Sequence, residues 1–233
     1  MSEISDNINN IRKLKSEAAK RAGRDDCTVK LMAVTKTRTA EEVNEAIKSG
    51  INDIGENKVQ ELIEKYDYVN PVNWHFIGHL QTNKVKYIID KVCMIHSVDR
   101  INLAKEIDKR AKKSNRIMNI LIEINLGREE TKSGIYKEEL YNFIDDILKG
   151  TDNIIIRGIM CIPPRFDDKE CSRTYFKEAN EIFNRLKKSF PNDEKIKIDT
   201  LSMGMSNDFE VAIEEGSTII RVGSSIFGKR NYR

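Results

Sequence analysis

A lysine at the end of a short apolar segment is the residue of this chain best suited to covalent chemistry. Lys36 follows the apolar run 31–35 and precedes a polar turn at 37–39. A lysine that ends a buried strand is partly desolvated, which lowers its pKa and leaves the amine free to act as a nucleophile. Such an amine forms Schiff bases with carbonyl compounds. A solvated, unreactive lysine at a strand end is the commoner case. The residues at the other strand ends must therefore show whether Lys36 belongs to a binding site.

Two segments rich in glycine and serine, 202–206 and 223–225, follow the last two expected strands. Glycine lets the backbone approach a ligand closely, and exposed N–H groups together with serine hydroxyls bind phosphate oxygens. Barrel enzymes often hold phosphate between the loops after strands seven and eight, beside the N-terminus of a short helix. Residues 224–227 fit such a helix. The two segments therefore predict a phosphate site.

Arg221 lies near the end of the final apolar strand, 219–222. A guanidinium that points into a barrel needs an acceptor, because its burial without one is costly. Two partners are open at this point: a core carboxylate such as Glu123, or an acceptor on a ligand, for example a pyridine nitrogen. Because arginine stays protonated, it would keep that nitrogen unprotonated and make the ring a weaker electron sink.

The elements that position these residues alternate between strand and helix along almost the whole chain. Helix 39–49 is typical: Thr39 is the expected N-cap and Gly50 ends it. A further helix is expected to begin near Gln81. Strands joined by helical crossovers are parallel, and eight such units favour a closed barrel over an open doubly wound sheet. The expected strands are 31–35, 52–55, 74–77, 94–97, 117–125, 154–160, 196–201 and 218–222.

The fold class expected from this pattern is α/β, a single (β/α)8 TIM barrel with an extra N-terminal helix. We assign residues 1–233 to one domain, because no linker rich in glycine or serine divides the chain. Residues 1–25 form the extra helix, which is expected to pack on the outside of the barrel. No G-x-G-x-x-G follows any expected strand, which weakens the dinucleotide-binding version of the open sheet.

Composition excludes several kinds of partner. The chain has 40 Lys and Arg against 37 Asp and Glu, interleaved, so it creates no long-range field for nucleic acid or a membrane surface. No apolar run approaches the roughly 18 residues that cross a bilayer, and the N-terminus lacks a signal peptide's apolar core. Its four cysteines form no C-x-x-C pair, and its three histidines are too scattered for a metal site. We expect a cytoplasmic protein with free thiols, no metal, no nucleic acid and no membrane.

Six longer motifs resemble one known family. They occur in the family's order and span nearly the whole chain, so together they are far more specific than any one of them. The chain resembles the YggS/PROSC family, the pyridoxal 5′-phosphate (PLP) homeostasis proteins, which are related to the N-terminal domain of alanine racemase. The motifs are residues 31–37, 55–61, 75–84, 158–164, 201–206 and 221–228.

The resemblance implies a cofactor and a way of holding it. PLP would form a Schiff base with Lys36, and Arg221 would face its pyridine nitrogen. Ser202, Gly223 and Ser224 match phosphate-loop positions of the family.

The remaining predicted contacts also follow from the resemblance. Asn57 matches a position near the cofactor ring. His79 and Asn83 lie within one family motif, and Met160 lies within another. The full set of predicted cofactor-binding residues is Lys36, Asn57, His79, Asn83, Met160, Ser202, Arg221, Gly223 and Ser224.

Three functions use these residues. The first is a PLP-binding protein that stores, buffers or delivers the cofactor without robust turnover, as the resemblance implies. The second is a PLP-dependent amino-acid racemase, which needs an acid or base on each face of the ring; the racemase relatives take the second base, a tyrosine, from a further domain that we do not expect here. The third is a Schiff-base aldolase acting on a sugar phosphate, which has no evident use for Arg221.

We expect the first of these functions, with PLP-dependent apoenzymes as recipients of the cofactor. We also expect a monomer, because a closed barrel leaves no sheet edge to pair with another chain.

Overall fold

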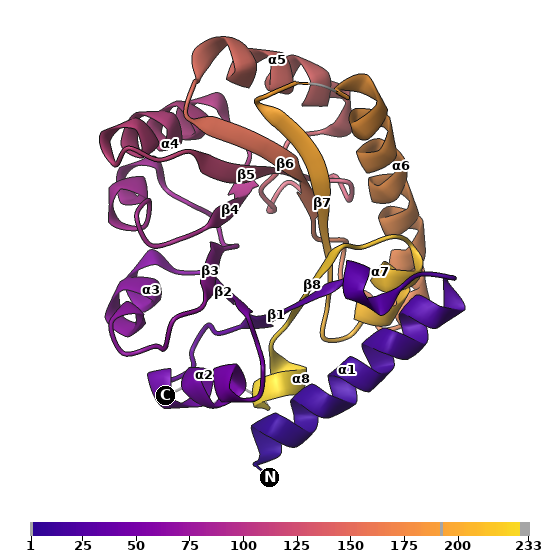
Figure 1. Ribbon diagram of the computed structural model, residues 1–233. Coiled ribbons are helices and arrows are strands. Elements are labelled where there is room, and N and C mark those ends of the chain that lie inside the picture. The colour runs from indigo at the N-terminus through magenta and orange to yellow at the C-terminus, as the bar shows by residue number, and fades with distance from the viewer. Residues whose placement is uncertain (1, 192, 229–233) are drawn as a thin grey trace.

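The computed structural model describes residues 2–191 and 193–228, and a closed barrel of eight parallel strands lies at its centre (Figure 1). Neighbouring strands pair in chain order, and β8 pairs with β1 to close the barrel. The predicted (β/α)8 TIM barrel is therefore confirmed. The strands are β1 (Lys30–Val34), β2 (Asp53–Glu56), β3 (Asn73–Phe76), β4 (Met94–Val98), β5 (Met118–Ile124), β6 (Ile154–Cys161), β7 (Ile196–Met205) and β8 (Ile219–Val222).

Helices surround the barrel on its outer side (Figure 1). The extra N-terminal helix is α1, which is capped by Ser2 and packs against α2, α7 and α8. Helix α2 has the expected N-cap, since Thr39 and Glu42 form a reciprocal capping box. The α-helices are α1 (Glu3–Arg21), α2 (Ala40–Lys48), α3 (Val59–Tyr66), α4 (Ile101–Lys113), α5 (Leu140–Gly150), α6 (Arg173–Ser189), α7 (Phe209–Glu214) and α8 (Ser224–Phe227); the 3-10 helices are η1 (Asp26–Thr28), η2 (Thr82–Tyr87), η3 (Lys137–Glu139) and η4 (Lys169–Ser172).

The main hydrophobic core lies between the strands and the helices. Helix α6 shows how it forms: Phe176, Ala179, Phe183 and Leu186 recur at helical spacing, and all are buried. Two small apolar clusters are separate from this core, one around Met32 and the other containing Met94, Leu121 and Met160. Since side chains alternate across a strand, these clusters lie on the inner face of the barrel.

Two expected elements differ from the structure. The crossover after β3 is the short 3-10 helix η2 and not an α-helix. Strand β7 continues through Met205, whereas a loop was expected from Ser202. Its register with β8 shifts between Ser202 and Met205, around Gly204 at φ +90°.

No helix among the described residues is long and apolar enough to cross a bilayer. In the same part of the chain, no group of three or more His, Cys, Asp or Glu side chains is arranged to hold a metal ion.

Gly158 is expected to be essential for the close approach of β6 to β7. Its φ is +143°, and a Cβ there would lie 1.9 Å from the carbonyl oxygen of Thr200. Backbone strain and steric overlap should each cost about 1–3 kcal/mol, so Gly158→Ala should lower the free energy of unfolding by about 2–6 kcal/mol in urea titrations. Gly150→Ala is the control, since its Cβ would meet only the flexible Lys105 side chain, and it should be neutral or slightly stabilising. Equal effects of the two variants would contradict this account.

Candidate functional site

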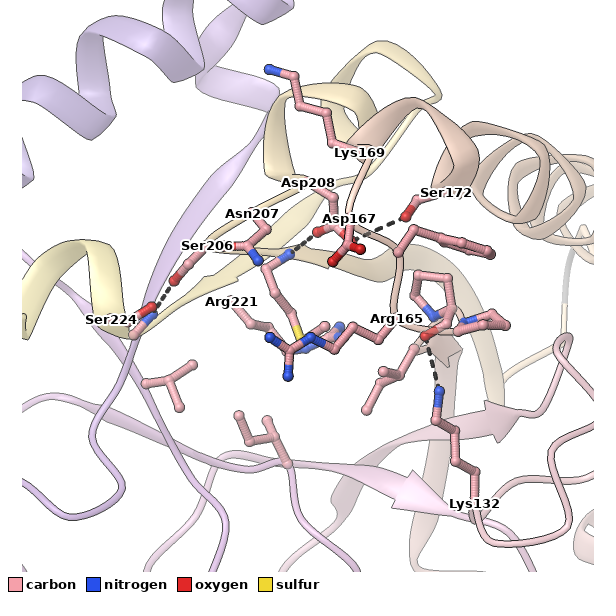
Figure 2. Close-up of a pocket in the computed structure, with 18 of the residues that line it drawn as sticks. Lys132, Arg165, Asp167, Lys169, Ser172, Ser206, Asn207, Asp208, Arg221 and Ser224 are labelled. Carbon is pink, nitrogen blue, oxygen red and sulfur yellow. Dashed lines mark hydrogen bonds between the residues drawn. The ribbon is translucent and has the colours of Figure 1, made fainter. Parts of the chain in front are cut away.

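A cavity of about 820 Å³ lies at the carboxyl ends of the strands (Figure 2). Its size is within the range of about 300–1,000 Å³ that is usual for small-molecule sites. Residues at the ends of β1, β2, β7 and β8 line it, together with the loop that follows β6. Five of the predicted cofactor-binding residues are among them: Lys36, Asn57, Arg221, Gly223 and Ser224.

A buried ion pair fixes the strand end that carries Lys36. Lys36 is half-buried and follows Thr35, which is fully buried. Lys65 Nζ donates to the Thr35 carbonyl at 2.8 Å and pairs with Glu56 Oε2 at 2.6 Å, and the Thr35 hydroxyl donates to the same carboxylate oxygen at 3.1 Å. The Lys65 and Glu56 side chains are only 10% and 0% exposed. Since one partner cannot leave without stranding a buried charge, the position of Lys36 is well defined.

The same carboxylate positions Asn57. Glu56 Oε1 accepts hydrogen bonds from the backbone N–H groups of Asn57, at 2.7 Å, and Lys58, at 3.4 Å. Asn57 Oδ1 is buried and has no hydrogen-bond partner among the described residues. Because buried polar atoms are almost always paired, an unpaired amide oxygen at a cavity wall indicates that a donor on a ligand belongs there.

Arg221 presents its guanidinium to the cavity from β8. It is 4% exposed; Nη1 donates to Ser202 Oγ at 2.7 Å and Nη2 to the Cys161 carbonyl at 3.0 Å. No ion pair found within residues 2–191 and 193–228 includes Arg221, so the alternative partner Glu123 does not pair with it. A guanidinium has five N–H donors, and those not used by protein remain for an acceptor on a ligand.

Backbone N–H groups converge at the start of α8. The N–H groups of Gly223 and Ser225 both donate to Ser206 Oγ, at 3.2 and 3.4 Å. Figure 2 shows Ser206 and Ser224 facing each other at this side of the cavity. A Cβ at Gly223 would lie 3.3 Å from the Val34 side chain, so the glycine keeps this wall open. Paired N–H donors beside hydroxyls fit a phosphate group.

Four predicted contacts do not line the cavity in the structure. Ser202 and Met160 are fully buried, the first bonded to Arg221 and the second packed against Leu121. His79 is exposed, with Nδ1 3.0 Å from the Ser133 hydroxyl, and Asn83 is exposed on η2. Their roles as cofactor contacts stay predictions.

Several lining residues were not predicted from the sequence. Lys132 Nζ donates to the Pro163 carbonyl at 3.0 Å, which ties the loop after β5 to the loop after β6. Arg165 reaches from the second loop into the cavity in front of Arg221 (Figure 2). Ser206 had been included in a motif but not assigned. The loops that follow the strands build the active sites of these barrels. The position of these residues in such loops was therefore the one feature of the sequence that could have predicted them as lining residues.

The chain is similar to proteins with a named function. Residues 4–231 match the family model "Alanine racemase, N-terminal domain". A pyridoxal phosphate homeostasis protein of Aquifex aeolicus is 45% identical over 218 residues, which are 93% of each chain. The structure of PipY from Synechococcus elongatus with PLP bound is 29% identical, has a TM-score of 0.83, and is matched over 97% of this chain and 100% of that one.

More distant structures share the fold alone. An alanine racemase of Clostridium difficile is 17% identical with a TM-score of 0.70, and all of this chain covers only 58% of it.

Removal of one partner from the Lys65–Glu56 ion pair should destabilise the fold. Lys65→Met leaves the Glu56 carboxylate buried and unpaired, so it should lower the free energy of unfolding by about 3–5 kcal/mol. Lys58→Met is the matched control, because the Lys58 side chain is 71% exposed in its pair with Glu61 and should contribute less than about 1 kcal/mol. Urea titration of both variants is the measurement. A Lys65→Met protein as stable as Lys58→Met would rule out this role.

Glu123 should make stability depend on pH. Burial and, to a smaller extent, the nearby Asp99 carboxylate raise its pKa from 4.5 to about 7 against the opposing effect of Arg221. Because the unfolded chain releases this proton first, stability should fall as pH rises from 4.5 through 7, by roughly 3 kcal/mol in total. Glu123→Gln removes this contribution, so its unfolding free energy relative to the unsubstituted protein should grow over that interval. Parallel pH curves for the two proteins would contradict the assignment.

Proposed function

Because the chain belongs to the family of pyridoxal phosphate homeostasis proteins, within the wider alanine racemase N-terminal domain family, we propose that it binds PLP in this cavity and takes part in PLP homeostasis. One observation carries the proposal. A single cavity combines a lysine amine, a buried guanidinium, an unpaired amide oxygen and paired backbone N–H donors. PLP carries a group for each of them: an aldehyde, a pyridine nitrogen, a phenolic hydroxyl and a phosphate.

Each residue then has a proposed role. The Lys36 amine holds the aldehyde covalently as a Schiff base. Arg221 donates to the pyridine nitrogen, and Asn57 Oδ1 accepts from a donor of the bound cofactor. The phosphate lies at the start of α8, where the N–H of Gly223 and the hydroxyls of Ser206 and Ser224 can reach it.

We propose storage or delivery of PLP without robust turnover. The racemase relatives take the second of their two bases from a tyrosine, and no tyrosine occurs among the described residues that line the cavity. This supports a carrier over a racemase. An aldolase on a sugar phosphate would leave Arg221 and Asn57 without an obvious partner, whereas both suit a hydroxypyridine ring.

The proposal extends to the surroundings of the protein. PLP-dependent apoenzymes are the proposed recipients, and a monomer is proposed because the sheet closes on itself. A cytoplasmic location is supported by the four cysteines, which are free in the described part of the chain and so suit a reducing compartment.

The proposed covalent link is tested by Lys36→Arg and Lys36→Ala. Arginine keeps the positive charge but does not form an imine with the PLP aldehyde, and alanine has no amine at all. Both variants should therefore lose the imine absorbance of the PLP-loaded protein. Borohydride reduction followed by peptide mass spectrometry should place the pyridoxyl adduct on Lys36 of the unsubstituted protein. Lys58→Ala, outside the cavity, is the control and should keep both signals.

Two results would contradict parts of this proposal. Unchanged imine absorbance in Lys36→Ala would refute the assignment of this lysine. Rapid exchange of the α-proton of L-alanine in D2O by the PLP-loaded protein, removed by Lys36→Ala, would favour the racemase instead.

A further inference from the structure

A continuous line of hydrogen-bonded side chains crosses the barrel interior from the cavity to the amino end of β2; we call it the relay. Arg221 Nη1 lies 2.7 Å from Ser202 Oγ, which lies 3.1 Å from His96 Nδ1. His96 Nε2 lies 3.0 Å from His75 Nδ1, and His75 Nε2 lies 3.0 Å from Asp53 Oδ1. All five residues are at most 7% exposed. Bulk water therefore has little access to the groups of the relay.

The two ends of the relay determine its direction. Arg221 can only donate, and an ionised Asp53 can only accept. With both rings neutral, the Ser202 hydroxyl must then donate to His96 Nδ1, so the proton of His96 is on Nε2 and is donated to His75. His75 in turn carries its proton on Nε2 and donates it to Asp53. Both histidines thus have one permitted tautomer, although tautomers are otherwise free to vary.

From this geometry we propose that His96 and His75 are positioning residues for the arginine that meets the ligand. They hold the Ser202 hydroxyl so that its lone pairs face Arg221, which fixes the guanidinium toward the cavity. The ligand part of this inference rests on the proposed function, whereas the relay itself does not. Sequence patterns alone gave no reason to connect these histidines with Arg221, because 21 residues separate them from each other and over 100 separate His96 from Ser202.

The charges along the relay suit this role. Arg221 is a buried cation with no ion-pair partner among the described side chains, which is unfavourable unless its hydrogen bonds are well made. Burial, together with the nearby His75 and Arg221, holds the pKa of His96 well below its usual value, so this ring stays neutral. At the far end, burial is the largest single effect and lowers the pKa of His75, but the hydrogen bonds to Asp53 and Cys93 and the charges of these two groups together outweigh it, so the pKa is raised.

A proton taken up at His75 should reverse the relay without breaking it. Protonated His75 donates through Nδ1 to His96 Nε2, so the proton of His96 must move to Nδ1, which then donates to Ser202. The Ser202 oxygen then accepts from both Arg221 and His96, and the Ser202 hydroxyl hydrogen no longer has His96 as its acceptor. The groups that face His75 and affect this step are Asp53, His96 and the Cys93 thiol at 3.5 Å, with the charge of Lys30 acting on Asp53.

The relay is tested by 15N NMR of the whole protein labelled at histidine, first without PLP. The chain has only three histidines, and His79→Gln identifies the exposed one. At alkaline pH, His75 and His96 should both show the neutral tautomer protonated at Nε2. On acidification, His75 should gain a proton while His96 changes tautomer and stays neutral. A His96 ring protonated at Nδ1 at alkaline pH, or two rings that titrate like free histidine, would overturn the relay.

The positioning role is tested by PLP binding. His96→Phe removes the acceptor for Ser202, so the dissociation constant for PLP should rise about tenfold, as expected for a lost buried hydrogen bond near a charged group, and the absorbance maximum of bound PLP should shift. His96→Gln offers an amide oxygen to Ser202 and should recover part of both effects.

Thr151→Val is the matched control, because Thr151 makes a buried hydrogen bond to the Ile147 carbonyl at 2.8 Å outside the relay. It should lower stability without changing PLP affinity or absorbance. Unchanged binding in His96→Phe, or an equal loss in Thr151→Val, would overturn the positioning role. A wild-type protein that binds no PLP would refute the proposed function and the positioning role together. The histidine tautomers measured by NMR would still test the relay independently of PLP.

Discussion

The buried ion pair between Lys65 and Glu56 is the interaction on which the candidate site depends. One carboxylate receives the Lys65 ammonium and the Thr35 hydroxyl on one oxygen, and the backbone N–H of Asn57 on the other. The lysine comes from α3 and the glutamate from the end of β2, so a helix on the outside of the barrel is tied to two strand ends at its mouth. A buried pair of this kind contributes specificity of position more than net stability. Here it fixes the residues that flank the cavity.

A second constraint comes from the interior of the barrel. An eight-stranded barrel is just wide enough for side chains to fill, and apolar residues would fill it at lower cost. Instead, polar side chains from β2, β3, β4, β7 and β8 occupy part of it and satisfy one another from Asp53 to Arg221. The network allows a guanidinium to be buried at the cavity floor. A ligand that meets Arg221 therefore meets a donor whose orientation was set before binding.

This protein shares its barrel fold with alanine racemases but differs from them in the residues that reach the cavity. The barrel fold is shared with a structure that is only 17% identical. The chemistry open to each protein depends on what else reaches the cavity, since function belongs to the site and not to the fold. In this protein the loops after β5 and β6 reach it, with Lys132 bonded to Pro163 and Arg165 directed inward. These loops supply charge at the entrance and no aromatic hydroxyl among the described lining residues.

The sequence by itself determined the barrel, the order of its strands and the five residues that line both the predicted site and the cavity, from Lys36 to Ser224. It could do so because apolar periodicity, caps and glycines act locally, and the topology of a parallel barrel brings strand ends together; the assignment of Asn57 came from the family resemblance and not from spacing. Only the tertiary structure showed that Ser202 accepts a hydrogen bond from Arg221. It also showed that His75 and His96 connect Ser202 to Asp53 by hydrogen bonds, and that Lys65 donates to the Thr35 carbonyl. These contacts depend on which side chains meet across strands far apart in the chain, and on burial that removes water as an alternative partner. Neither these long-range contacts nor the burial can be predicted from the spacing of residues along the chain.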